Sequence, residues 1–272
     1  MRRLFPIAVV ALVFGACVGE DPTDPPAPVG PDASTDGPGG ETASDAPIAD
    51  TGGDTDSGPS FVCPMGALFC ETWDDDPLLD GWMQEVGNGH TLGSIASTRS
   101  PPRALSATLL DTPIGRAYAR LTRNLTVADV AKLTLRFDAR IARRDSPLDG
   151  GVEGELKIAG LAMGGFASFV AYKSQSLTLH YSRSEAGGVM AGPSASFAFG
   201  QWHTVEVILQ RKPTPMLTLR VDGGAVAPAA DLGVTAVPAV RVILGADSEI
   251  EGASAPSGAS EVELDNVVLL AE

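Results

Sequence analysis

The sequence predicts an all-β fold, a two-sheet antiparallel jelly-roll sandwich, and two observations support this prediction. Beyond residue 61, short segments of alternating apolar and polar residues follow one another, bounded by Gly, Pro, Asp and Ser. The same region shows no sustained 3.6-residue periodicity. With about 200 residues available, such a chain is long enough to form one sandwich with its own core.

The clearest element is a β-hairpin formed by residues 204–210 and 217–221. In both runs apolar and polar residues alternate, which sets one face of each strand against a core. Pro213 and Pro215 mark the corner between the runs, because proline has no N–H for a strand ladder. The Asp-Gly-Gly sequence at 222–224 marks the next turn, since glycine accepts positive φ without steric strain.

The other expected strands are short and show no repeat of fixed period. They cover residues 91–97, 103–109, 117–125, 132–143, 153–163, 166–173, 176–183, 195–199, 239–245 and 261–270.

The N-terminal segment, residues 1–16, is predicted to be an export signal. Two arginines precede an apolar run from Leu4 to Phe14, which is too short to cross a bilayer as a helix of about 20 residues. The residues Val-Phe-Gly-Ala before Cys17 resemble a bacterial lipobox, with Phe in place of the usual Leu. That resemblance implies cleavage before Cys17 and a lipid anchor on its new N-terminus. The alternative is an ordinary signal peptide with Cys17 unmodified.

Because Val18 is not the Asp that retains lipoproteins at the inner membrane in some bacteria, an exported protein anchored to the outer membrane is favoured. Residues 17–60 are rich in Asp, Pro, Gly, Ser and Thr and are predicted to form a disordered tether to a folded domain at 61–272. A coil of this length has an end-to-end distance of roughly 35 Å. The acidic residues lack the spacing of an EF-hand.

Charge is distributed unevenly along the chain. Residues 18–98 contain sixteen acidic and no basic residues, whereas residues 99–272 contain eighteen acids and seventeen bases, within a total formal charge of −15. No basic stripe of the kind that binds phosphate backbones is present, so nucleic acid is not expected as a partner.

Two cysteines open the expected domain. Cys63 and Cys70 are separated by six residues, and export would favour a disulfide between them. Two free buried thiols are the alternative. A metal site is less favoured, because two cysteines at this spacing have no histidine cluster beside them.

Three segments resemble concanavalin A-like lectin and glucanase jelly rolls, a group that includes laminin-G-like domains. They are the Phe-Cys-Glu-Thr-Trp-Asp opening at 69–74, the Gly-Gln-Trp-His strand start at 200–203 with its Leu-Arg-Val-Asp-Gly partner at 219–223, and the closing Val-Glu-Leu-Asp-Asn-Val at 262–267. The resemblance implies that the first and last strands lie side by side. We expect Trp202 to be a core residue and His203 to face solvent.

The resemblance also implies a calcium site where the first and last strands meet, with Asp265 as a ligand and Glu71 or Asp74 nearby. Alternatively, Asp265 and Asn266 satisfy backbone groups at the strand edge. Calcium is therefore a candidate structural ion.

Catalysis is not expected. Retaining glucanases need two carboxyls about 5 Å apart, and the nearest candidates are the pair Glu153 and Glu155 and the group Glu261, Glu263 and Asp265. Neither matches the motif at the position typical of the family, and solvated strand acids explain both. The histidines, at 90, 180 and 203, show no zinc-ligand spacing, and no Gly-x-Ser-x-Gly elbow occurs.

Sugar binding requires exposed aromatic rings beside polar groups. Phe166 and Phe169 lie near Tyr172 and Tyr181 in adjacent expected strands, and the two tyrosines are the candidate ligand-binding residues. The sequence thus predicts a non-catalytic module that binds a glycan or another surface polymer. A divergent glycoside hydrolase or lyase, and an adhesion or structural module that contacts another protein, are the alternatives.

Overall fold

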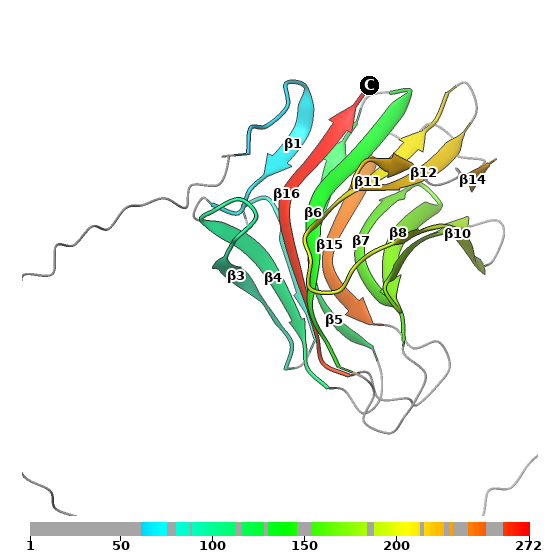
Figure 1. The fold of residues 1–272 in the computed structure, drawn as a ribbon. Coiled ribbons are helices and arrows are strands. Elements are labelled where there is room, and N and C mark those ends of the chain that lie inside the picture. The colour runs from blue at the N-terminus through cyan, green and yellow to red at the C-terminus, as the bar shows by residue number, and fades with distance from the viewer. Residues whose placement is uncertain are drawn as a thin grey trace, which may run out of the picture. The chain divides into compact units, whose positions relative to one another are not determined.

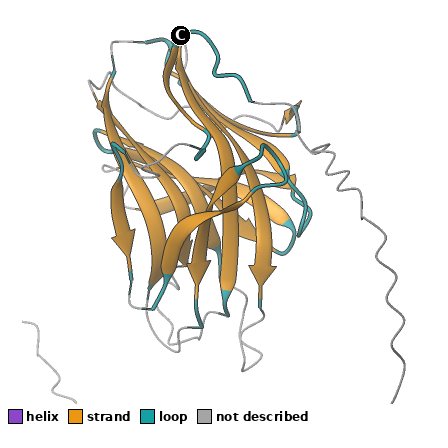
Figure 2. Ribbon diagram, turned by 90° about the vertical axis from the view of Figure 1, so that its left-hand side faces the viewer, coloured by secondary structure: helices purple, strands orange, loops and turns teal. Residues whose placement is uncertain are grey.

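The computed structural model describes residues 61–74, 80–87, 89–111, 116–127, 130–145, 154–183, 188–212, 215–225, 229–230, 239–248 and 258–272. The signal and tether expected at residues 1–60, including Cys17, lie outside the described residues. The described part consists of strands and loops, without helices (Figure 2). This confirms the predicted all-β class.

The strands form two antiparallel sheets. Sheet A contains β1 (Ala67–Glu71), β3 (Thr91–Ala96), β4 (Arg103–Leu109), β6 (Lys132–Arg144), β11 (His203–Gln210), β12 (Met216–Val221), β13 (Gly224–Ala225), β14 (Ala229–Ala230) and β16 (Ser260–Ala271). Sheet B contains β2 (Met83–Val86), β5 (Ala117–Thr126), β7 (Leu156–Met163), β8 (Phe166–Lys173), β9 (Ser176–Arg183), β10 (Gly188–Ser196) and β15 (Ala239–Ser248).

The order of strands shows how the chain moves between the sheets. Sheet A runs β13-β12-β11-β6-β16-β4-β3, with β1 also paired to β16 and β14 to β12. Sheet B runs β10-β9-β8-β7-β15-β5-β2. Strands distant in sequence are therefore neighbours in both sheets, which is the connectivity of a jelly-roll sandwich. The predicted architecture is confirmed.

The first and last strands lie side by side, as expected. β1 pairs antiparallel with β16 (Figure 1). Glu71 of β1 lies opposite Val267 of β16. A disulfide joins Cys63, which precedes β1, to Cys70, which lies within β1. The start of the sandwich is thus held both by strand pairing and by a covalent bridge.

The core lies between the sheets and is formed by alternate residues of each strand. In β6 of sheet A, Leu135 and Phe137 are fully buried, and in β5 and β15 of sheet B, Leu121 and Leu244 are fully buried. The residues between them point to the outer faces of the sheets. The interior is therefore a continuous apolar layer, as the period-two pattern predicted.

The hairpin is also confirmed. β11 pairs with β12 so that Val205 lies opposite Val221. Asp222 and Gly223 then form a two-residue turn into β13, with φ of 51° and 77°. Two successive positive φ values are typical of a type I′ turn, and they explain the Asp-Gly sequence there. Pro213, at the expected corner, lies outside the described residues.

Two expectations from the sequence were wrong, and one strand was missed. The strand expected at 195–199 is instead β10, which ends at Ser196, while Phe197 packs in the core. β2 had no counterpart among the expected strands. His203 is buried and Trp202 is partly exposed, the reverse of the expectation, because His203 shares the inward phase of Val205.

We expect Phe137→Ala to lower the free energy of unfolding by about 3–5 kcal/mol, because it leaves a cavity in the centre of the core. Phe199→Ala is the matched control, since this side chain is 46% exposed, and we expect a change within about 0.5 kcal/mol. Urea denaturation of both variants measures the difference. Equal losses would contradict the assigned core.

Candidate functional site

A hollow lies on the outer face of sheet B. It encloses about 150 Å³ and is lined by residues of β5, β15, β7 and β8, together with Arg116. Alternation along the strands decides which side chains reach it. In β5, Ala119 and Leu121 point into the core, so that Arg120 points outward. In β15, Leu244 and Ala246 point into the core, so that Asp247 points outward as well.

Two β-bulges shape the floor of this hollow. The register of β15 against β7 shifts between Leu244 and Asp247, and that of β7 against β8 shifts between Lys157 and Ala159. Each bulge bends its strand and turns the following side chain in a new direction. Because the shifts lie in neighbouring strands, they act on the same patch of sheet B.

Glycine at two positions allows neighbouring strand backbones to approach closely beneath the hollow. A Cβ on Gly245, which has φ of 130°, would lie 2.3 Å from the carbonyl oxygen of Ala119. A Cβ on Gly160 would lie 2.8 Å from that of Ser168. Backbone therefore approaches backbone at both positions, and glycine is required there.

Two arginines and one aspartate form a wall of the hollow. Asp247 is 6% exposed and accepts hydrogen bonds from Arg116 Nε at 3.1 Å and Arg120 Nη1 at 2.9 Å. Arg120 also donates from Nε to Glu85 at 2.8 Å. Both guanidinium groups lie over the ring of Tyr118, at 5.6 and 5.5 Å. Arg120 and Asp247 are thus held in fixed positions on β5 and β15, and Arg116 is held directly before β5.

The opposite side of the hollow carries a row of stacked groups. Lys157 Nζ lies 4.7 Å from the centre of the Phe169 ring. The rings of Phe169 and His180 are stacked, with centroids 5.0 Å apart. His180 Nε2 in turn lies 3.2 Å from Glu155 Oε2. Lys157 and Phe169 line the hollow, whereas His180 and Glu155 are not among its lining residues.

A second hollow continues the first along the strands. It has a volume of about 510 Å³ and shares Ala162 and Ala167 with the first hollow. Beyond them it is bordered by Arg241, which donates to Asn124 Oδ1 at 3.1 Å. We call the two hollows together the sheet B groove. From Ala239 to Asp247 of β15 it extends about 26 Å, at about 3.3 Å per residue.

The predicted ligand-binding tyrosines do not line this groove. Tyr172 is 3% exposed and contacts Phe197 in the core, with ring centroids 5.8 Å apart. Tyr181 also packs against the core. Both lie on the inward phase of their strands, so neither ring faces the groove. Phe169, on the outward phase of β8, faces the groove, and Phe166 also borders its second hollow.

The three predicted calcium ligands contact different partners. Glu71 accepts from Trp82 Nε1 at 3.3 Å, Asp74 accepts from the Arg103 backbone N–H, and Asp265 accepts from Ser97 Oγ at 2.8 Å. Among the described residues, no group of three or more His, Cys, Asp or Glu side chains is arranged to hold a metal ion. The structure therefore does not bring the expected ligand set together.

Asp265 instead anchors a loop to the outer face of sheet A. It is fully buried and accepts hydrogen bonds from Ser97, from Ser100 Oγ at 2.7 Å and from the Asn266 backbone N–H at 2.8 Å. Burial raises the pKa of Asp265 to about 6, although these hydrogen bonds oppose the shift. The alternative considered from the sequence, satisfaction of local polar groups, describes this carboxyl.

The other candidate acids also lie away from the groove. Glu261 and Glu263 point to the outer face of sheet A, where Glu263 accepts from Arg140 Nε at 2.6 Å. Burial raises the pKa of Glu263, and the nearby Arg140 opposes this shift. Glu153 lies outside the described residues, and Glu155 is the acid beside His180.

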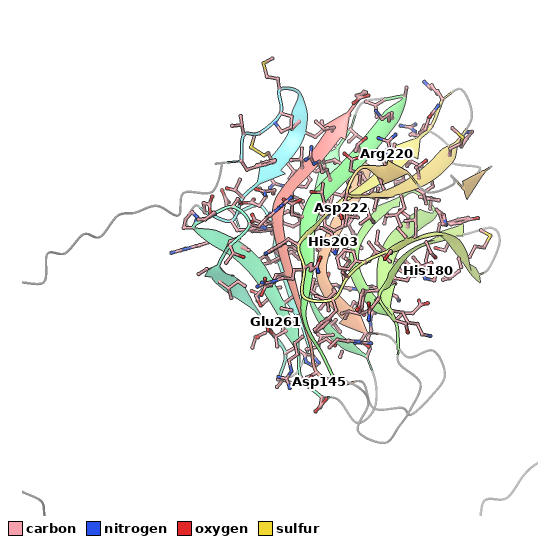
Figure 3. The ribbon with its side chains drawn as sticks, viewed as in Figure 1. Asp145, His180, His203, Arg220, Asp222 and Glu261 are labelled. Atoms are coloured by element: carbon pink, nitrogen blue, oxygen red, sulfur yellow. A yellow bond between two sulfur atoms is a disulfide. The ribbon has the colours of Figure 1, made fainter. Side chains whose placement is uncertain are left out.

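The histidines occupy separate places. Figure 3 shows His203 beside Asp222, with His203 Nδ1 2.6 Å from the carboxylate, and His180 apart from both. His90 Nδ1 accepts from the Leu110 backbone N–H at 3.1 Å. Burial lowers the pKa of His90. The structure thus does not place the histidines together as a zinc site.

Sequence reasoning missed the arginines and Asp247. The alternation of Arg116, Tyr118 and Arg120 in one strand is a visible signal, because it puts three long side chains on one face. Asp247 follows the expected end of its strand, and its pairing with residues more than 120 positions earlier is not visible in the sequence. Nothing in the sequence around Gly245 indicated the β-bulge there.

No family model matches the sequence, and no curated protein matches it. Among solved structures, the chain is similar to the endo-β-1,4-glucuronan lyase from the fungus Trichoderma reesei, with 17% identity, a TM-score of 0.57 and coverage of 76% of this chain and 96% of that chain. It is also similar to the cellulose induced protein Cip1, with 12% identity, a TM-score of 0.51 and coverage of 74% and 96%. The binding domain of botulinum neurotoxin serotype D has 9% identity, a TM-score of 0.50 and coverage of 76% and 48%. These similarities show the fold.

Across the part of the chain that the structure describes, no helix has the length and apolar character needed to span a bilayer.

We expect Gly245→Ala to destabilise the protein by about 2–4 kcal/mol, since the added methyl group meets the Ala119 carbonyl and the backbone has positive φ. Gly93→Ala is the matched control, because nothing lies within 4 Å of the position that its added methyl group would take. Thermal unfolding compares the two. A control loss as large as that of Gly245→Ala would argue against the close approach.

The raised pKa of Asp265 predicts a pH dependence of stability. The folded protein binds this proton more tightly than the unfolded chain, so the contribution favours folding at low pH and is lost as pH rises from about 4 to about 6. The loss is up to about 3 kcal/mol. Asp265→Asn should remove this slope in urea denaturation between pH 4 and 6, whatever its absolute stability. A slope unchanged from the unmodified protein would contradict the shift.

Proposed function

We propose that the protein is a non-catalytic carbohydrate-binding module, which holds a polysaccharide chain along the sheet B groove. The elongated groove is the observation that carries this proposal. Its two hollows share Ala162 and Ala167, so one extended ligand can occupy both. Fixed polar groups and an aromatic residue line it, as in carbohydrate sites where polar groups orient the ligand and apolar surface contacts it.

The nature of the groove walls supports binding by a largely preformed surface. Arg120 and Asp247 are held by ion pairs, and the floor is strand backbone at Gly160 and Gly245. A ligand therefore meets groups that need little ordering, which lowers the entropic cost of association. The sandwich fold that it shares with a glucuronan lyase is consistent with a polysaccharide as ligand.

The arrangement of carboxylates supports binding without hydrolysis. Among the described residues that line the groove, Asp247 is the one carboxylate, and it is engaged by two arginines. Retaining glycosidases use two carboxyls about 5 Å apart.

We further propose that the module is exported and carried on a lipid anchor at Cys17 by the acidic tether, at the outer membrane.

Tyr118 favours a lyase as the second candidate function. Its ring lies beneath the guanidinium groups of Arg116 and Arg120 at the edge of the groove. In β-elimination such a pair would neutralise the sugar carboxylate while the Tyr118 oxygen takes the adjacent C5 proton; the C4–O bond then breaks as the C4–C5 double bond forms, and the leaving oxygen receives that proton. If so, incubation with a polyuronate would release unsaturated chain ends, and Tyr118→Phe would abolish their formation. Binding without new chain ends would favour the module.

We expect Ala162→Trp to weaken polysaccharide binding by about tenfold or more, because the indole would fill the groove where its two parts meet. Ala96→Trp makes the same change at an exposed position of β3 in sheet A and should leave affinity unchanged. Affinity electrophoresis in gels containing a panel of polysaccharides measures both. Retardation of the two variants to the same extent would place binding elsewhere, and binding to no polysaccharide would remove the proposal.

A further inference from the structure

We infer that the ligand of the sheet B groove is an acidic polysaccharide, whose carboxylate or sulfate groups are bound by the arginines and the lysine along the groove. This inference rests on the proposed function and names the class of its ligand. The sequence did not indicate it, because the folded region as a whole is nearly neutral, with eighteen acids and seventeen bases at residues 99–272.

The groove concentrates positive charge. Its lining contains Arg116, Arg120, Lys157 and Arg241 against the single carboxylate of Asp247. Two further acids lie close to the groove without lining it: Glu85 pairs with Arg120, and Glu155 lies beside His180. A surface lined in this way attracts anions, and its low-dielectric walls strengthen the local field.

The arginine end of the groove is oriented for oxyanions. Asp247 and the ring of Tyr118 fix the planes of both guanidinium groups. Both side chains remain partly accessible, with 42% of Arg116 and 21% of Arg120 exposed. A guanidinium presents its donors as a rigid fork that matches a carboxylate or a sulfate. The Nε and Nη2 donors already bind Asp247 in Arg116 and Glu85 in Arg120, so an acidic group of the ligand would bind at the accessible surface that these contacts leave, with both side chains held in place.

The positive charges lie at both ends of the groove, which indicates a polymer. Lys157 lies opposite Asp247 in the pairing of β7 with β15, and Arg241 lies six residues earlier in β15. Six residues of strand correspond to about 20 Å. A small anion cannot reach both ends, whereas a chain with acidic groups at intervals can. The inference is thus an acidic polysaccharide rather than a free anion.

The experiment measures binding of the full chain to three polymers by isothermal titration calorimetry at low and high ionic strength. The probes are polyglucuronate, dextran sulfate and neutral dextran. We expect binding to at least one acidic polymer, weakening as salt rises, and weaker or no binding to dextran. Stronger binding to polyglucuronate would identify carboxylates as the groups that the groove binds, and stronger binding to dextran sulfate would identify sulfates.

The variant that tests the site is the double substitution Lys157→Gln/Arg241→Gln. It removes one charge at each end of the groove, and we expect affinity for the acidic polymer to fall by about tenfold, with a shallower salt dependence. The matched control is Lys132→Gln/Arg220→Gln, which removes the same two charges from sheet A. Arg220, labelled in Figure 3, is exposed between the buried residues Leu219 and Val221 of β12. Thermal unfolding checks that both variants remain folded.

The outcomes separate this inference from the proposed function. Binding to dextran as tightly as to the acidic polymers would overturn the inference and leave a carbohydrate-binding module. Equal weakening by the test and control variants would also overturn it, because binding would then depend on the net charge of the protein and not on the charges in the groove. Failure to bind any polysaccharide, in this assay and in the gel panel, would remove the proposed function itself.

Discussion

Sheet A depends on the pairing of its last strand. β16 lies between β6 and β4 and also pairs with β1, so that three strands from the first half of the domain are joined through it. Most of its residues are buried. Its partner Leu105 lies 159 positions before Leu264. Because such distant contacts must close long loops before they stabilise anything, the sandwich can be completed only when the C-terminal strand is present.

Polar networks on the outer faces of sheets A and B have different roles. On sheet A, Asp138 accepts hydrogen bonds from Arg99, Thr204 and Asn266, and the neighbouring Asp265 is fully buried. That network satisfies its donors and acceptors internally and holds the loop before β4 in place. On sheet B the Arg116–Asp247 pair is exposed to the same degree as the Arg99–Asp138 pair of sheet A, but it stands beside a hollow. A polar network thus serves structure on one face, whereas on the other it borders space for a ligand.

The alternation in the sequence was sufficient to predict the class, the hairpin and most strands, because period two decides which side chains enter the core. It was not sufficient for the site. Tyr172 looked like a binding residue by type, yet its phase places it inside with Val170. Asp247 becomes part of a site only through β15 lying between β5 and β7, a long-range pairing that no local pattern encodes. The bulge at Gly245 then shifts the register that simple alternation assumes.

The groove lies where the local rules of a strand are broken. Two neighbouring bulges and a glycine at φ of 130° interrupt regular pairing, and each reduces the stability that an ideal sheet would have. The interruption lowers the floor beside Gly160 and directs Asp247 toward the arginines. Because these groups are carried by strands of a closed sandwich rather than by long loops, their positions are set before any ligand arrives. The structure thus exchanges regularity at one patch of sheet B for a surface of fixed shape and charge, while the continuous core beneath it preserves the fold.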